Sequence, residues 1–326
     1  MEEDAVPRRI NYLRMSITDR CNLRCAYCTY WRDWKKSPAA EILRYEELLR
    51  LAVVASELGI SKIRITGGEP LVRRGLVEFL EKLHRVPGID KVCLTTNGVL
   101  LPELAPALYD AGLRHLNVSL DTLRWERYRQ ITGRDNLGEV LAGLEAAASL
   151  GFQPLKINCV VLRGINDDEV LDLARLARNH PYQVRFIELM PTTSKQWWQR
   201  HFLPMKEVHR RLTRLGPLIP AGQDPAAGPA INFHVPEFQG EIGLISTMDG
   251  HHCPHCNRLR LTADGKLRPC LLSTAEFDLK GPLRLGLGDD LLAYLFQEAL
   301  ELKFNQARVS PELSVLPGWP MVSVGG

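Results

Sequence analysis

Six of the eight cysteines fall into two groups whose spacing suits metal chemistry. The first group is Cys21, Cys25 and Cys28, a C-x-x-x-C-x-x-C arrangement that directly follows an expected strand. Three thiolates this close together can hold three irons of a cubane cluster and leave the last iron open to another ligand. Zinc is the alternative, but it would need a further ligand, and no other Cys or His stands nearby in the sequence. We therefore predict an iron–sulfur site that binds a small molecule.

The second group combines three cysteines with three neighbouring histidines: Cys253, Cys256, Cys270, His251, His252 and His255. These residues suit either a second cluster or a structural Cys₃His zinc site. Arg258 and Arg260 follow the second cysteine of the group, and arginine is well suited to bind phosphate or the polar edge of a heterocycle. A solvated basic turn is the alternative for these arginines. The sequence predicts a metal site beside a ligand-binding pair of arginines.

Alternating strands and helices are expected to form the scaffold that positions these groups. Six short runs rich in β-branched or apolar residues are expected to be strands: Tyr12–Thr18, Lys62–Thr66, Val92–Thr96, His115–Asp121, Leu155–Leu162 and Gln183–Met190. Segments with helical periodicity lie between them: Tyr45–Leu58, Gly75–Arg85, Pro102–Ala111, Leu137–Leu150 and Asp167–Arg178. Because strand–helix–strand units are parallel and right-handed, we predict an α/β protein with an open, barrel-like sheet. A doubly wound sheet is the competing topology.

The C-terminal third departs from this rhythm. Residues 216–240 are rich in Pro and Gly and are expected to form a loop or linker. We predict one domain over residues 1–215 and a C-terminal segment over residues 216–326. The elements expected after the linker are two strands, Glu241–Ser246 and Lys266–Leu272, and a helix, Asp289–Phe304.

Polar side chains recur on one face of all six predicted strands. Since side chains alternate along a strand, one parity gives the following set: Arg14, Ser16, Thr18, Arg64, Thr66, Cys93, Thr95, Asn97, Asn117, Ser119, Asp121, Lys156, Asn158, Glu188 and Met190. An ordinary small parallel barrel is filled by Val, Ile and Leu, and unpaired polar groups are costly to bury. We therefore expect an open cavity that holds a polar ligand, with Arg14, Arg64 and Lys156 attracting an anion. A polar outer face is the alternative, although parallel sheets are normally covered on both faces.

Composition excludes several classes of protein. The 326 residues include 41 basic and 38 acidic side chains, so the formal net charge is +3, and 45% of the residues are hydrophobic. This balance is typical of a soluble globular protein and predicts no nucleic-acid binding. No run reaches the roughly 18 apolar residues of a membrane helix, and the acidic start does not resemble a secretion signal. We expect a cytoplasmic protein with reduced cysteines and no membrane contact.

Several motifs together resemble those of a known enzyme family. The first cysteine group, with Tyr27 before its last cysteine, resembles the radical S-adenosylmethionine (SAM) signature. Gly67-Gly68-Glu69-Pro70 resembles the loop of that superfamily for the SAM amino group. The wider pattern resembles the GTP 3′,8-cyclase (MoaA) family of molybdenum cofactor biosynthesis in these segments: LRMSITDRCNLRCAYC (13–28), IRITGGEPLVRR (63–74), LTTNG (94–98), NVSLD (117–121), KINCVVLRGIN (156–166), RFIELMP (185–191), CNRLRLTADGKLRPCL (256–271) and the terminal Gly325-Gly326.

The resemblance implies a fold, cofactors and a set of site residues. The fold would be an incomplete (β/α)₆ TIM-like barrel closed by a C-terminal segment. Each cysteine group would hold a 4Fe–4S cluster, the first on Cys21, Cys25 and Cys28, the second on Cys253, Cys256 and Cys270. The implied SAM contacts are Tyr27, Gly68, Ser119 and Met190. The implied GTP contacts are Arg14, Arg64, Thr95, Lys156, Arg258 and Arg260, and a catalytic role is implied for Arg258, Arg260, Gly325 and Gly326.

The resemblance also implies a reaction and partners. Cleavage of SAM would give methionine and a 5′-deoxyadenosyl radical, which would take the C3′ hydrogen of GTP. The C3′ radical would then attack C8, and reduction would give (8S)-3′,8-cyclo-7,8-dihydroguanosine 5′-triphosphate. The implied partners are a flavodoxin- or ferredoxin-like electron donor, a downstream pterin-forming enzyme and a second copy in a homodimer. The alternatives are a radical SAM enzyme for another nucleotide, a peptide or RNA, and a non-catalytic iron–sulfur or zinc protein that binds a nucleotide.

Overall fold

One twelve-stranded sheet organises the molecule. The computed structural model describes residues 9–28, 36–191, 194–222, 228–246, 256–271 and 273–305. The strands are β1 (Tyr12–Ser16), β2 (Lys62–Thr66), β3 (Lys91–Thr96), β4 (His115–Ser119), β5 (Leu155–Val161), β6 (Gln183–Glu188), β7 (Ile219–Pro220), β8 (Ile231–His234), β9 (Glu241–Ile245), β10 (Arg258–Leu261), β11 (Lys266–Arg268) and β12 (Phe277–Asp278). Their order in the sheet is β12-β11-β10-β1-β2-β3-β4-β5-β6-β9-β8-β7.

The central part of the sheet is parallel and curves into an incomplete barrel. Strands β1 to β6 lie side by side in chain order, β10 pairs parallel with β1, and β9 pairs parallel with β6. The remaining strands pair antiparallel at the two edges. The C-terminal strands therefore extend the sheet at both of its ends. This arrangement confirms the predicted incomplete barrel with a closing C-terminal segment.

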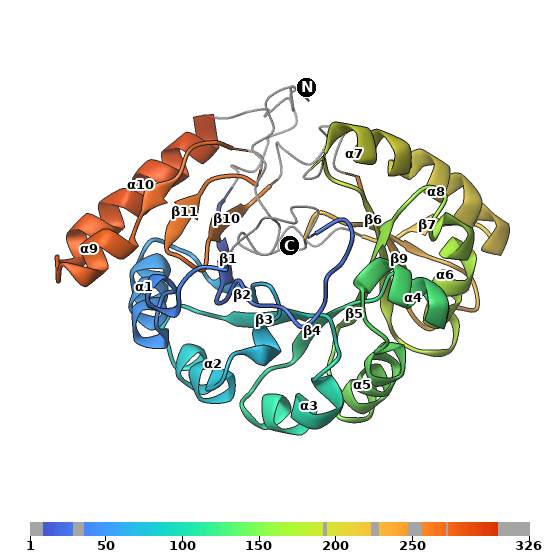
Figure 1. Cartoon of the computed structure of the whole chain (residues 1–326), viewed down its shortest axis with the longest axis horizontal. Coiled ribbons are helices and arrows are strands. Elements are labelled where there is room, and N and C mark those ends of the chain that lie inside the picture. The colour runs from blue at the N-terminus through green and yellow to red at the C-terminus, as the bar shows by residue number, and fades with distance from the viewer. Residues whose placement is uncertain are drawn as a thin grey trace.

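The helices lie outside the arc of strands. They are α1 (Tyr45–Glu57), α2 (Leu76–His84), α3 (Leu101–Asp110), α4 (Trp125–Thr132), α5 (Leu137–Ser149), α6 (Val170–Asn179), α7 (Lys195–His201), α8 (Met205–Leu212), α9 (Lys280–Arg284) and α10 (Asp289–Asn305). Figure 1 shows α1, α2, α3, α5 and α6 on the convex side of the strands, which leaves the concave side to the interior of the barrel. A doubly wound sheet would carry helices on both faces, so that alternative is wrong. No helix in the described ranges is long and apolar enough to cross a bilayer.

The two faces of the strands differ in chemistry. In β5, Leu155, Ile157, Cys159 and Val161 are buried, whereas the residues between them, Lys156 among them, are only partly buried. The buried set belongs to the main apolar core, which packs the sheet against the outer helices. Burial of this apolar face supplies the main stabilisation of the fold and leaves the opposite face free to carry polar groups.

The predicted polar parity is wrong for one strand. In β6, the register pairs Asn158 with Arg185, so Arg185 shares the inner face, whereas Glu188 has the opposite parity and borders the cavity from the end of the strand. The Glu188 carboxylate instead accepts hydrogen bonds from the backbone N–H of Met205, at 2.9 Å, and from the hydroxyl of Ser246, at 3.2 Å. The polar Glu188 at the end of β6 suggested the wrong parity, although Val184 and Phe186, which share that parity, pack in the apolar core.

Some elements differ from the expectations. The segment 216–240 contains the two short strands β7 and β8, although it was expected to be a loop, and Arg258 and Arg260 lie in a strand rather than in a turn. Helices α4, α7 and α8 were not predicted. Each has only seven or eight residues, so a helical period repeats about twice and is hard to recognise in the sequence. The division of the chain at residue 215 stays a prediction.

Candidate active site

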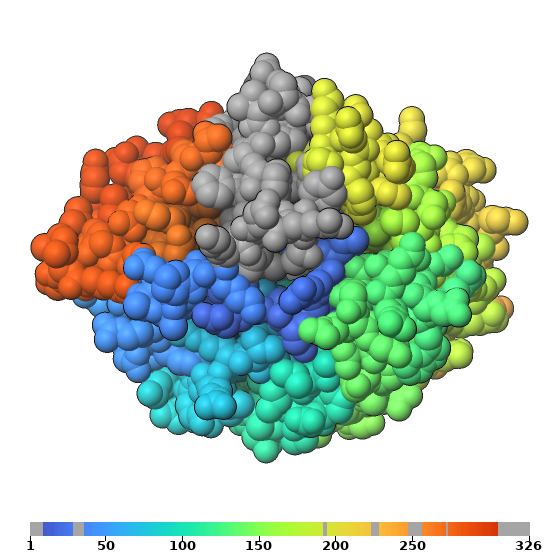
Figure 2. All heavy atoms as spheres, in the orientation of Figure 1, coloured from blue at the N-terminus to red at the C-terminus, as the bar shows by residue number. Residues whose placement is uncertain are grey.

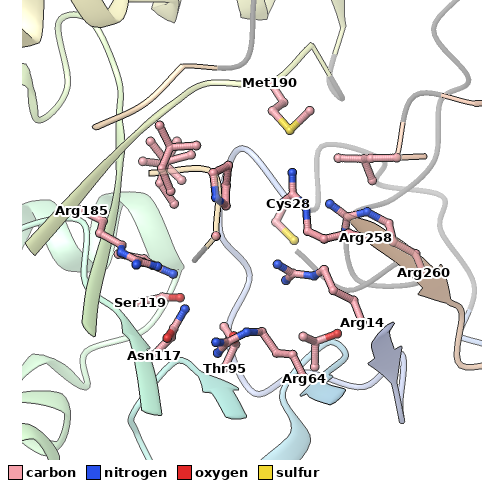
Figure 3. A pocket seen from close by; sticks show the side chains of 18 of the residues that line it. Arg14, Cys28, Arg64, Thr95, Asn117, Ser119, Arg185, Met190, Arg258 and Arg260 are labelled. Atoms are coloured by element: carbon pink, nitrogen blue, oxygen red, sulfur yellow. The ribbon is translucent and has the colours of Figure 1, made fainter. Parts of the chain in front are cut away.

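The inner face of the barrel lines a cavity of about 370 Å³. Cys21, Cys25 and Cys28 border the cavity, and so do Cys256 and Cys270 of the second group. Figure 3 shows the guanidinium groups of the surrounding arginines pointing into this space from several strands. The two cysteine groups, which lie more than 220 residues apart in the sequence, therefore share one cavity with the polar strand face.

Backbone hydrogen bonds hold the loop of the first cysteine group against α4. The N–H of Arg24 donates to the carbonyl of Thr132 at 2.8 Å, and the N–H of Ala26 donates to that of Ile131 at 2.8 Å. The loop is thus fastened to the end of α4, and Figure 2 shows part of this N-terminal segment (dark blue) at the surface beside the green elements that include α4. The backbone N–H of Leu23 donates to the Cys21 sulfur at 3.4 Å. A donor directed at the sulfur is what a thiolate ligand needs.

The three thiols of this loop fit an iron–sulfur cluster. Burial raises the pKa of Cys25 well above its usual value, and the charges of Cys28, Asp121 and Cys21 raise it further. The Cys25 sulfur would therefore be repelled by those of Cys28 and Cys21 if all three were thiolates. Cationic irons between the sulfurs would relieve that repulsion, because metal binding deprotonates its thiol ligands.

The Gly67-Gly68 pair makes a turn with no room for side chains. A Cβ on Gly67, where φ is +154°, would lie 2.5 Å from the carbonyl oxygen of Thr18, and a Cβ on Gly68 would lie 2.4 Å from that of Arg20. The backbone N–H of Gly68 donates to Thr18 O at 2.7 Å. The turn is therefore pressed against the start of the cysteine loop, and only glycine permits this approach.

Glu69 joins this turn to the next strand end. Its buried carboxylate accepts from the N–H of Leu71 at 3.0 Å, the hydroxyl of Thr96 at 2.7 Å and the N–H of Asn97 at 2.6 Å. Burial raises the pKa of Glu69 to about 7, against the lowering effect of these hydrogen bonds. Asn97 in turn donates to the side-chain oxygen of Asn22 at 2.7 Å. The ends of β2 and β3 are thus connected to the cysteine loop.

Every residue implied as a SAM contact borders the cavity: Tyr27, Gly68, Ser119 and Met190. So does every residue implied as a GTP contact: Arg14, Arg64, Thr95, Lys156, Arg258 and Arg260. Cys253, Gly325 and Gly326 lie outside the described residues, as do His251, His252 and His255.

A dense group of cations forms the floor of the cavity. Arg14 pairs in register with Arg64 on one side and with Arg260 on the other, so three arginines lie side by side on adjacent strands. Burial and the neighbouring Arg260 lower the pKa of Arg14 well below its usual value. Burial also lowers the pKa of Lys156 to about 7, and Arg185 and Arg64 contribute to this shift. Such a concentration of positive charge favours a multiply charged anion as its ligand.

Two further cations were missed by the sequence analysis. Arg185 is 5% exposed, and its Nε has no hydrogen-bond partner in the described part of the chain. Burial and Arg64 lower its pKa to about 10. Lys62 also lines the cavity, and its ammonium lies 4.6 Å from the centroid of the Tyr12 ring. Lys62 shares its parity with Arg64 and could have been found, whereas Arg185 was hidden by the wrong parity of β6.

Cys256 carries the clearest sign of a ligand in the second group. Burial raises the pKa of its thiol, but Arg258 and Lys303 outweigh this effect and lower the pKa to about 5. The sulfur is therefore a thiolate at neutral pH, which is the form that binds metals. Cys256 and Cys270 fit a metal or cluster site that faces Arg258 and Arg260.

The comparisons with known proteins agree with this site. Residues 15–177 match the Radical SAM superfamily model, and residues 182–309 match the model Molybdenum Cofactor Synthesis C. The protein is therefore a radical SAM enzyme. SuiB of Streptococcus suis bound to S-adenosylmethionine shares the fold, with a TM-score of 0.62 at 12% identity over 88% of this chain and 68% of that chain.

More similar relatives define the family. The GTP 3′,8-cyclase of Moorella thermoacetica is 49% identical over 301 residues, which cover 92% of this chain and 93% of the relative. That of Pelotomaculum thermopropionicum is 46% identical over 330 residues, covering 99% and 100%. The chain belongs to the GTP 3′,8-cyclase family. SAM and 4Fe–4S clusters are its cofactors, and the alternative functions considered from the sequence are not favoured.

Proposed function

We propose that this protein converts GTP to (8S)-3′,8-cyclo-7,8-dihydroguanosine 5′-triphosphate, the first step of molybdenum cofactor biosynthesis. One observation carries the proposal: a single cavity joins the first cysteine group, a floor of buried cations and the second cysteine group. A radical generated at one end can therefore act on a nucleotide held at the other. The relatives named GTP 3′,8-cyclase support this choice of substrate.

Cys21, Cys25 and Cys28 would hold the first cluster, whose open iron would bind SAM. When bound there, a reduced 4Fe–4S cluster supplies the electron that cleaves SAM to methionine and a 5′-deoxyadenosyl radical. The role of the chain is to orient SAM. The Gly67-Gly68 turn leaves its backbone accessible to the methionine part, and Tyr27, Ser119 and Met190 border the space beyond it.

The cation floor would bind the triphosphate. Arg14 and Arg64 lie side by side on the adjacent strands β1 and β2, and Lys156 lies on the same inner face in β5, with β3 and β4 between β2 and β5. Arg185 adds a buried guanidinium whose Nε has no partner among the described residues. Guanidinium groups bind phosphate oxygens through paired hydrogen bonds, and burial strengthens such contacts. Thr95 adds a hydroxyl, which accepts from Arg64 at 3.3 Å. By binding the triphosphate, these residues would hold the ribose at a fixed distance from SAM. Holding two reactants in a fixed geometry accelerates their reaction.

The second group would bind the guanine base. A second cluster with an open iron would be held by Cys253, Cys256 and Cys270. The guanidinium groups of Arg258 and Arg260 would point to the guanine base and to the phosphates of GTP. The terminal Gly325 and Gly326 are proposed to reach the substrate. Zinc at this group is the competing occupant, and the family assignment favours the cluster.

We also propose partners that supply electrons to the reaction and take up its product. A flavodoxin- or ferredoxin-like carrier would supply electrons, and a pterin-forming enzyme would take the product. We propose a cytoplasmic location and a homodimer.

Single-residue variants test whether the first cysteine group cleaves SAM and the second binds GTP. Cys25→Ala should abolish 5′-deoxyadenosine formation, while Cys256→Ala should retain SAM cleavage better than GTP cyclisation. Arg258→Ala and Arg260→Ala should lose the cyclised product with both clusters still present. Product and 5′-deoxyadenosine are quantified by mass spectrometry beside iron content. Equal loss of both products in Cys256→Ala, or wild-type cyclisation in either arginine variant, would contradict the assigned roles.

A further inference from the structure

Lys303 occupies a position on α10 that belongs to the core face of the helix. The buried residues of α10 are Leu292, Phe296, Ala299 and Lys303, and their spacing follows one face of a helix. The first three are apolar, whereas the last is a lysine that is 4% exposed. A buried ammonium is costly unless a partner receives its hydrogens. The position therefore requires a specific partner for the Lys303 side chain.

That partner is the sulfur of a cysteine in the second group. The Nζ atom of Lys303 lies 3.3 Å from Sγ of Cys256, which is 47 residues away in the sequence. Both residues border the cavity. Because an ammonium can only donate, the sulfur must accept, and it accepts best as a thiolate. The same sulfur also interacts with Arg258, so cations approach Cys256 from both β10 and α10.

We propose that Lys303 donates a hydrogen bond to the Cys256 thiolate and thereby raises the reduction potential of the cluster at the second cysteine group. Potentials of iron–sulfur clusters depend on the hydrogen bonds to their sulfurs and on nearby charge. A positive donor stabilises the reduced, more negative state more than the oxidised state. Lys303 is a positioning residue that acts through Cys256. This inference rests on the proposed function, because it takes the second group to hold a 4Fe–4S cluster.

The test measures the potential of the second cluster by itself. In the full chain, Cys21, Cys25 and Cys28 are replaced by alanine, so that only the second group holds iron. The protein is reconstituted anaerobically and titrated with dithionite, and the reduced cluster is followed by electron paramagnetic resonance. Lys303→Met should shift the midpoint potential to lower values. Lys303→Arg keeps a positive donor and should therefore have a potential close to that of the parent. Lys206→Met, which removes a charge from the exposed side of α8, should leave the potential unchanged.

The possible outcomes separate this inference from the proposed function. An unchanged potential in Lys303→Met with full iron content would overturn the inference and leave the second cluster in place. An equal shift in Lys206→Met would also overturn it, because the effect would then be one of overall charge. If Lys303→Met fails to fold, Lys303→Gln and Lys303→Arg give the same comparison. Absence of iron from the parent with Lys303 intact would overturn the second cluster itself.

Discussion

The hydroxyl of Tyr27 donates a hydrogen bond of 2.6 Å to the carboxylate of Asp121. The other carboxylate oxygen of Asp121 accepts from the backbone N–H of Val160 at 2.8 Å. Burial raises the pKa of Asp121 to about 6, although both hydrogen bonds oppose this effect. Tyr27 directly precedes Cys28, so this one carboxylate connects the first cysteine loop with β5, which carries Lys156 into the cation floor.

Tyr27→Phe is expected to weaken this connection. The change removes one hydrogen bond and leaves a buried carboxylate with fewer donors, which costs about 1–3 kcal/mol of unfolding free energy. Urea denaturation of the anaerobic protein measures the loss, and 5′-deoxyadenosine formation should fall with it. Tyr294→Phe, on the exposed surface of α10, is the matched control. Unfolding of Tyr27→Phe at the same urea concentration as the parent would show that the hydrogen bond is unimportant.

Gly68→Ala is expected to disturb the turn that faces SAM. The added methyl group would lie 2.4 Å from the carbonyl oxygen of Arg20, so the backbone must shift. Overpacking of this kind costs about 1–3 kcal/mol, and the KM for SAM should rise at the same time. Gly222→Ala is the control, since no atom of the described residues lies within 4 Å of its added Cβ. Steady-state kinetics of SAM cleavage decides the matter, and an unchanged KM in Gly68→Ala would refute a tight fit of this turn to SAM.

Arg185→Met should weaken GTP binding without lowering the stability of the empty protein. Because the Arg185 Nε is buried and has no partner in the described ranges, the empty protein gains little from this side chain. The variant should unfold at a denaturant concentration no lower than the parent. Its affinity for GTP should fall by about 10- to 150-fold, the equivalent of about 1.5–3 kcal/mol for a charged hydrogen bond.

Calorimetric titration with GTP in the absence of SAM measures this affinity. Arg175→Met, which removes an exposed ion pair with Asp172 on α6, should bind GTP as the parent does. If Arg185→Met destabilises the empty protein and leaves GTP affinity intact, Arg185 is structural and the account of the cation floor is wrong.

The lowered pKa of Lys156 leads us to expect proton uptake when a nucleotide binds. Its pKa of about 7 lies below the ordinary value of 10.5, so the free protein carries mostly neutral Lys156 at about pH 8. A bound triphosphate favours the charged form and raises this pKa. Binding at about pH 8 should therefore take up a proton, and affinity should fall as the pH rises above 7.

Titrations in buffers of different ionisation enthalpy count the protons exchanged. The sign for stability is opposite: the unfolded state binds more protons between about pH 7 and 10.5, so this group makes the empty protein more stable as the pH rises through that window. Lys156→Met should abolish the uptake. Proton release, or uptake that persists in Lys156→Met, would show that another group titrates.

Much of this site could be predicted from the sequence, because its residues lie in regular elements. Period-two alternation placed Arg14, Arg64 and Lys156 on one face of parallel strands, and the structure brings these three residues to one cavity. The cysteine spacing identified the first loop in the same way. In such cases a local rule determines the orientation of the side chain.

The remaining features depend on tertiary contacts. Arg185 lies in a strand with a polar residue on each face, since Glu188 has the parity opposite to that of Arg185, and the register with β5 shows which face is inner. Lys303 approaches Cys256 because α10 packs across the C-terminal strands, and no local pattern links two residues 47 positions apart. Strand β10 was missed because its pairing with β1 joins distant parts of the chain.

The central claim is that a radical from SAM acts on C3′ of GTP in the shared cavity. The most direct measurement uses anaerobically reconstituted protein, dithionite, SAM and GTP deuterated at C3′, with mass spectrometry of the 5′-deoxyadenosine formed. The account predicts 5′-deoxyadenosine that carries deuterium. Unlabelled 5′-deoxyadenosine, formed while GTP is consumed, would contradict abstraction from C3′. No 5′-deoxyadenosine at all, in protein shown to contain iron and sulfide, would contradict the radical SAM activity itself.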